Sequence, residues 1–201
     1  MQQGSISTTP PEPHVHANAT PFEAPLRHPW GSRAVVTLLW AGAIVASVPL
    51  SPGHLLARVA IGMHVAGLVI ALGPIVLIDW YSLVWIAGLR SFRDVMRLAE
   101  ASHPVIWLGS GLLLASGAFL EPDLHRPLTW VKLVAVLVLL HNGVSVRHLG
   151  RSLGRLRSPR RLGDIPRRLR FPMIALFTIS QTGWWTAVVI GLATSFGRHG
   201  P

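Results

Sequence analysis

The sequence predicts an all-α integral membrane protein with five transmembrane helices, the last four forming an antiparallel bundle. Three observations support this fold class. Half of the 201 residues are hydrophobic and only 13% are charged, whereas soluble domains carry about 25% charged residues. Several apolar stretches approach the ~20 residues that cross a bilayer as a helix. Most of the charged residues gather in the segments between those stretches.

The net charge of +10 could indicate nucleic-acid binding, but its distribution argues against that function. Nine of the eighteen Lys and Arg residues lie between Arg147 and Arg170, directly after an apolar stretch. A basic loop beside a span is typical of the cytoplasmic side of a membrane, where anionic lipid headgroups are its natural partner. We therefore expect residues 147–170 to contact headgroups and expect no nucleic-acid partner. Because the chain has no cysteine, disulfides, thiolate metal sites and cysteine catalysis are excluded.

Residues 1–33 are rich in Pro, Ser, Thr and His and have no apolar period, which predicts a disordered cytoplasmic tail. The first transmembrane helix is expected at about 34–50, where Pro49 ends an apolar run. The polar leader before this run argues against a cleaved signal peptide. Residues 34–197 are therefore expected to form one transmembrane helical domain.

The second helix is expected at about 55–88 and carries His64 and Asp79 in apolar surroundings. Small residues in such a helix let a neighbouring helix or a flat ligand approach its backbone closely. The second helix has four small residues on which we base this expectation: Gly62, Gly67, Ala71 and Gly73.

A polar link is expected next, followed by the third helix at about 103–120 with Pro104 just inside its start. The fourth helix is expected at about 128–148 and the fifth at about 171–196. Small residues recur every four positions in the fifth helix, which predicts a tightly packed face: Gly183, Ala187, Gly191 and Ser195.

The charges of the loops predict the orientation. The basic loops are expected in the cytoplasm and the acidic link at 121–127 outside, which places the N-terminus in the cytoplasm. The protein is expected in the inner (plasma) membrane as a multi-pass protein.

Ionisable residues inside a membrane are costly, and each is by default a candidate for function. His64 lies about nine residues from the outer end of its helix and His141 about twelve residues from the outer end of the fourth. At 1.5 Å per residue, their depths differ by only a few Å. We expect the two helices to run antiparallel. His103 and His148, near the cytoplasmic ends, are secondary candidates.

Two interpretations of the histidine pair remain open. Imidazoles at matched depth suit axial ligation of a b-type haem, since neutral histidine is a common iron ligand. Alternatively, each imidazole hydrogen-bonds a neighbouring helix and only holds the helices together. Zinc is less attractive, because a closed zinc site needs four ligands and no carboxylate lies near those depths.

Two charged residues have alternative interpretations as well. Lys132 lies nine residues before His141, so it points to the opposite side of the helix and could snorkel to the interface as an anchor. Asp79 could form a structural ion pair with a basic residue of the adjoining loops, or it could relay protons.

One stretch resembles a known family. The segment Trp130-Val131-Lys132-Leu133, continuing to His141 and to Arg147-His148-Leu149-Gly150-Arg151, is similar to a span of small haem-binding membrane proteins. These are the HemJ-type protoporphyrinogen oxidases and the related copper-resistance protein D superfamily. The segment Gly62-Met63-His64, followed by Gly67 and Gly73, resembles their first helix. The likeness covers roughly residues 58–195.

The resemblance implies haem b held between four helices, with His64 and His141 as ligands and Lys132 near the site. The leading hypothesis is therefore a haem-b-binding membrane protein with an electron-transfer or oxidoreductase role. Its catalytic residues are not indicated by the sequence. The alternatives are a copper or small-solute permease of the copper-resistance type, and a non-catalytic membrane subunit. A homo-oligomer or a complex with a membrane partner protein would fit each of them.

Overall fold

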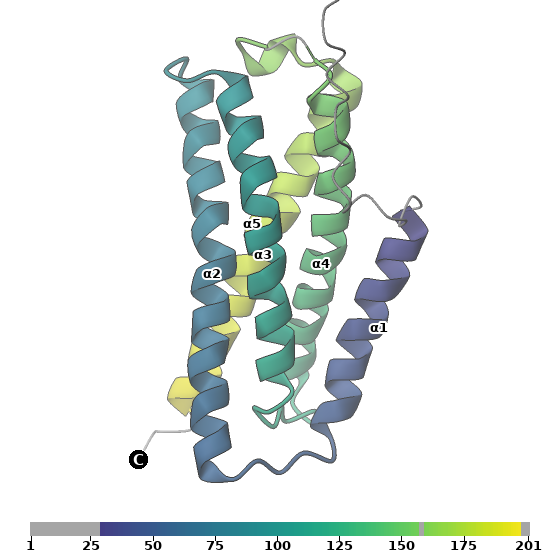
Figure 1. Ribbon diagram of the computed structural model, residues 1–201, viewed down its shortest axis with the longest axis vertical. Helices are drawn as coiled ribbons and strands as arrows, with labels where there is room; N and C mark the ends of the chain where they lie inside the picture. Colours follow the sequence, from purple (N-terminus) through teal and green to yellow (C-terminus); the bar gives the residue numbers. More distant parts are fainter. Residues whose placement is uncertain (1–28, 157–158, 198–201) are drawn as a thin grey trace, which may run out of the picture.

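The computed structural model describes residues 29–156 and 159–197. Over this range the chain is all-α and has no strand (Figure 1). Most of the predicted tail lies outside the described residues, while residues 29–33 belong to the first helix. The elements are α1 (Pro29–Ser47), α2 (His54–Ile86), α3 (Phe92–Gly117), α4 (Pro127–Leu153), a 3₁₀ turn η1 (Leu162–Asp164) and α5 (Arg167–Gly197).

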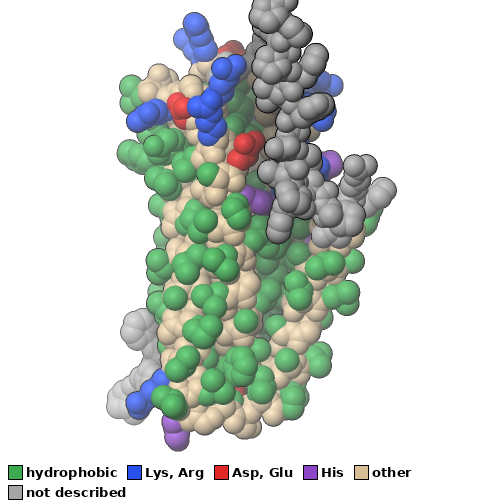
Figure 2. Space-filling view, viewed as in Figure 1, with side chains coloured by type: hydrophobic (Ala, Val, Ile, Leu, Met, Phe, Trp, Pro, Cys, Tyr) green, Lys and Arg blue, Asp and Glu red, His purple; other side chains and the backbone are tan. Residues whose placement is uncertain are grey.

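Four of the helices, α1, α2, α4 and α5, are long and apolar enough to cross a membrane. Their outer surfaces carry large hydrophobic side chains that lie exposed, such as Leu55 and Phe171, each 79% accessible. Figure 2 shows hydrophobic side chains along the length of the molecule and most Lys and Arg side chains at one end. So much exposed apolar surface is unfavourable in water. The chain is therefore a multi-pass membrane protein.

Helix α3 differs from the third helix that the sequence predicted. It begins at Phe92, eleven residues before the predicted start, so the polar link is largely helical and Pro104 lies well inside the helix. The start is fixed by a capping box, in which the Ser91 hydroxyl accepts from the Asp94 N–H and Asp94 accepts from the Ser91 N–H. These hydrogen bonds hold the pKa of Asp94 below its ordinary value. Helix α3 is not one of the helices that are long and apolar enough to cross a membrane.

Helices α2 and α3 form a closely packed hairpin around a short turn, where Gly88 has a positive φ of 78°. A Cβ atom added to Gly109 of α3 would lie 2.5 Å from the backbone nitrogen of Ala71 and 2.8 Å from the carbonyl oxygen of Gly67. Such close backbone contact is available only to small residues. The predicted small-residue face of the second helix is thus confirmed at Gly67 and Ala71.

Helices α4 and α5 form a second hairpin, and α1 packs against α4 and, less closely, against α3. At Gly183 of α5, an added Cβ atom would lie 2.8 Å from the side chain of Leu139, so the predicted small face is in close contact there. Two chain reversals separate α2 from α4, and these helices run in the same direction (Figure 1). The expectation that the helices of His64 and His141 are antiparallel is wrong.

The two hairpins meet at the end that carries the basic residues. A buried hydrophobic cluster joins the α2–α3 turn to the ends of α4 and η1: Trp85, Phe92, Val95, Leu153 and Ile165. The indole N–H of Trp85 also donates to the carbonyl oxygen of Pro159 at 3.2 Å. This cluster lies at the basic end, and four of its residues, Trp85, Phe92, Val95 and Leu153, also line a cavity between the hairpins.

Candidate functional site: a cavity between two helical hairpins

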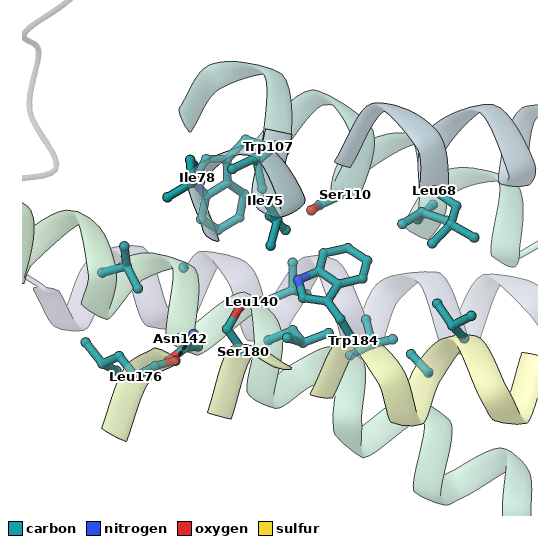
Figure 3. Close-up of a pocket in the computed structure, with 18 of the residues that line it drawn as sticks. Leu68, Ile75, Ile78, Trp107, Ser110, Leu140, Asn142, Leu176, Ser180 and Trp184 are labelled. Carbon is teal, nitrogen blue, oxygen red and sulfur yellow. Dashed lines mark hydrogen bonds between the residues drawn. The ribbon is translucent and has the colours of Figure 1, made fainter. Parts of the chain in front are cut away.

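A cavity of about 1500 Å³ lies between the α2–α3 and α4–α5 hairpins, and α1 contributes to its wall. Ligand pockets in proteins are mostly 300–1,000 Å³ and largely apolar, so this one is large. Figure 3 shows Leu68, Ile75 and Trp107 on one side of the space and Leu140 and Trp184 on the other. The space could hold a sizeable, mainly apolar molecule.

His64 is half-buried and lines this cavity from α2. Its Nδ1 lies 3.0 Å from the hydroxyl oxygen of Ser116 on α3. The Ser116 hydroxyl donates its own proton to the carbonyl oxygen of Leu112 at 2.6 Å. The hydroxyl must therefore accept from His64, which places the imidazole proton on Nδ1.

The imidazole of His64 also hydrogen-bonds the backbone of Leu113 on α3. With its proton on Nδ1, Nε2 is the nitrogen that keeps a lone pair. A histidine whose other ring nitrogen donates to an oxygen is the usual arrangement of a metal-ligating imidazole, since that bond fixes the ring and its tautomer. The local geometry of His64 is therefore compatible with that of a metal ligand.

His141 is placed differently. Its Nε2 lies 3.0 Å from the hydroxyl of Thr37 on α1. Because Thr37 donates to the carbonyl oxygen of Arg33, it accepts from His141. His141 does not belong to the residues that line the cavity. The structure thus does not bring His141 and His64 together.

Lys132 lines the cavity, near enough to His64 for the two groups to interact electrostatically. The prediction that Lys132 and His141 face opposite sides of their helix agrees with this placement. It is Lys132 that faces the cavity, while His141 faces α1.

The two secondary histidines lie apart from this group. His103 lines the cavity, but its Nε2 accepts from the indole N–H of Trp107 at 2.9 Å. His148 is exposed, and its Nδ1 lies 3.1 Å from a guanidinium nitrogen of Arg151. Of the two candidate histidines that line the cavity, His64 is the stronger ligand candidate, because the Nε2 lone pair of His103 already accepts from Trp107.

Asp79 also lines the cavity, and its partner is not the basic residue that the sequence suggested. The side-chain amide of Gln181 on α5 donates to its Oδ2. No Lys, Arg or His of the described residues forms an ion pair with Asp79. The bond to Gln181 joins α2 of one hairpin to α5 of the other.

The partners Ser116, Thr37 and Trp107 were not identified from the sequence. A signal for Ser116 was present: His64 and Ser116 each lie 26 residues from Arg90, in the turn of the α2–α3 hairpin. Residues equally distant from a tight turn meet when the two helices pack side by side. No comparable signal exists for Thr37, because α1 and α4 are not consecutive.

Among the residues that the structure describes, no three His, Asp or Glu side chains gather closely enough to hold a metal ion. Comparisons of the chain with models of known protein families, with curated proteins and with solved structures find no match. The likeness to the HemJ-type and copper-resistance proteins rests on the motifs quoted above. The cavity and the half-buried His64 that lines it are the candidate site.

Proposed function

We propose that this protein is an integral membrane protein that binds haem b in the cavity between its hairpins and has an electron-transfer or oxidoreductase role. One observation carries the proposal: His64 lines a large apolar cavity with its Nδ1 proton engaged and a lone pair on its Nε2. The motif resemblance adds to it, since the same histidine matches the family's first helix.

The residues of the cavity fit such a group. His64 would bind the haem iron, and Ser116 would hold its imidazole in orientation. The positive charge of Lys132, which lines the cavity near His64, would favour a carboxylate of the porphyrin. Apolar side chains and the indoles of Trp107 and Trp184 would exclude water. Haem supplies a one-electron couple when bound, and burial is one of the factors that set its potential.

Ligation by His141 as well stays a prediction. It would require that His141 leave Thr37 and that α4 turn toward the cavity. We expect His64 alone to be essential for binding.

The finer topology is also part of the proposal. We infer that α3 crosses the membrane as a fifth span, with its charged first turns at the basic end and its apolar part along α2. The last four helices would then form an antiparallel bundle. Arg90 and Arg93 lie in and just after the α2–α3 turn, at the same end as residues 147–170. By the positive-inside rule, this end and the N-terminus face the cytoplasm, and residues 147–170 meet anionic headgroups of the inner membrane.

The experiment is a haem titration of the purified full chain in lipid nanodiscs, read by absorption. The wild type is expected to develop a Soret band at one haem per chain, and His64→Ala is expected to lose it. His54→Ala is the matched control, because His54 starts the same helix but is exposed and does not line the cavity. A wild type without a Soret band would overturn the proposal and favour the permease or the non-catalytic subunit.

A further inference from the structure

The cavity has a second polar region far from His64. Asp79 lies fifteen residues further along α2, which corresponds to about 22 Å along the helix. Apolar side chains of the same helix line the wall between the two, among them Leu68 and Ile75 (Figure 3). Asp79 is therefore too far from His64 to belong to the same ligand shell.

The carboxyl group of Asp79 is half-buried and has one partner, the neutral amide of Gln181. The amide donates to Oδ2, while Oδ1 has no hydrogen-bond partner among the described residues. No cation compensates the carboxylate in the described part of the chain. An ion-paired aspartate would stay charged, whereas a carboxylate without a cation in apolar surroundings has a high free energy.

Gln181 can donate to Asp79 whether the carboxyl group is ionised or protonated, since one oxygen keeps its acceptor lone pairs in both states. The side chain can therefore gain and lose a proton at Oδ1 without losing its hydrogen bond to Gln181. This arrangement favours reversible proton binding over a fixed charge.

The cavity connects Asp79 to the basic end of the molecule. Glu100 and Arg151 line the same cavity and are exposed at that end, so water can enter there. Helix α5 contributes no ionisable side chain to the lining. The charged or titratable groups that share the cavity with Asp79 are His64 on α2, Glu100 and His103 on α3, Asp123 and Arg126 before α4, and Lys132, Arg147 and Arg151 on α4.

We infer that Asp79 is a proton-exchange site inside the membrane, held by Gln181 and supplied with protons through the basic end of the cavity. A proton from water adds to Oδ1 and converts the carboxylate to the neutral acid, and release returns the proton to water. The step needs no haem and no electron, so it is independent of the function proposed above.

The test is infrared difference spectroscopy of the haem-free full chain in nanodiscs between acidic and alkaline pH. The chain has eight Asp and Glu residues, and the others also protonate on acidification. The expected result is therefore one carbonyl-stretch component that the wild type shows and Asp79→Asn lacks. This component is expected to shift in frequency in Gln181→Leu, because the acid loses its hydrogen-bond donor. Asp94→Asn is the control and should keep the Asp79 component, since Asp94 lies in the cap of α3 and does not line the cavity.

Two results would overturn the inference. One is a carbonyl-stretch region that is the same in Asp79→Asn as in the wild type, and the other is an Asp79 component that Gln181→Leu leaves at the same frequency. Circular dichroism of each variant verifies its helix content, and Gln181→Leu keeps the test decisive if Asp79→Asn does not fold.

Discussion

His64 and His141 lie in two regions of the molecule that look alike in the sequence. Each is an imidazole in a long apolar helix, and their depths counted along the chain differ by only a few Å. In the α2–α3 hairpin, His64 lines the cavity, donates Nδ1–H to Ser116 and keeps a lone pair on Nε2. At the contact of α1 with α4, His141 donates Nε2–H to Thr37 and lies outside the cavity lining.

His64 and His141 lie at similar depth but have different partners, so depth alone does not decide what a membrane histidine does. The partner of the other ring nitrogen decides it, together with the helix that covers that face. We expect His64 to act as a ligand, because its partner fixes the ring and leaves a lone pair. We expect His141 to hold α1 against α4, as intramembrane hydrogen bonds commonly do.

The largest effect on stability is expected at the closest backbone contact between α2 and α3, the two helices that hold His64 and Ser116. Gly109→Ala places a methyl group against the backbone of Ala71, so α2 and α3 must separate, at a cost of about 1–3 kcal/mol. Gly111→Ala is the control, because an added Cβ atom there meets nothing within 4 Å. Unfolding in mixed micelles, followed by circular dichroism, measures the difference. Equal stability of the two variants would mean that the hairpin does not pack as described.

The next effect is on haem affinity, and it compares Ser116, which bonds the imidazole of His64, with Ser145, which bonds the backbone of His141. Ser116→Ala removes the acceptor for His64 Nδ1 and is expected to weaken haem binding by about 10–100-fold, as loss of such outer partners usually does. Ser145→Ala is the control, because the Ser145 hydroxyl donates to the carbonyl oxygen of His141. A haem titration of both variants measures the difference in affinity. A similar loss of affinity in the two would mean that the partner of His64 is no more important for haem binding than the neighbour of His141.

A smaller effect is expected at the α1–α4 contact. Thr37→Val removes the partner of His141 and should cost about 0.6 kcal/mol, the average for hydrogen bonds between membrane helices. Haem affinity should not change. The control is Thr178→Val, whose hydroxyl bonds only to its own helix, at Ile174. A weaker haem complex in Thr37→Val alone would show that His141 takes part in binding.

The smallest effect concerns the capping box at the start of α3, which touches neither histidine. The pKa of Asp94 is below its ordinary value, so this cap stabilises the fold above the pKa of the unfolded chain, and the stabilisation is lost as pH falls through the folded pKa. Asp94→Asn should therefore lower the melting temperature at neutral pH and make no difference in acid. A melting difference that persists below the folded pKa would contradict this assignment.

Much of the fold could be predicted from the sequence, because a helix that crosses a bilayer needs a long apolar stretch. The predicted bounds of the second helix agree with α2 within two residues. The start of α3 could not be located by hydropathy, since its first turns are charged. The capping residues Ser91 and Asp94 were the signal for it.

The candidate site was only partly predictable. His64 and Asp79 stood out as ionisable residues in an apolar helix, and both line the cavity. The orientation of His141 depended on α1, which packs on the face of α4 that carries this residue. A sequence gives the faces of each helix but not which helices meet, so pairing two histidines by depth could not anticipate Thr37.

The most direct test of the account is haem binding by His141→Ala compared with His64→Ala, with both variants in nanodiscs and read by their Soret and reduced-state spectra. His141→Ala is expected to bind haem with the wild-type spectrum, and His64→Ala is expected not to bind it. Loss of binding in His141→Ala, or an unchanged spectrum in His64→Ala, would contradict the account.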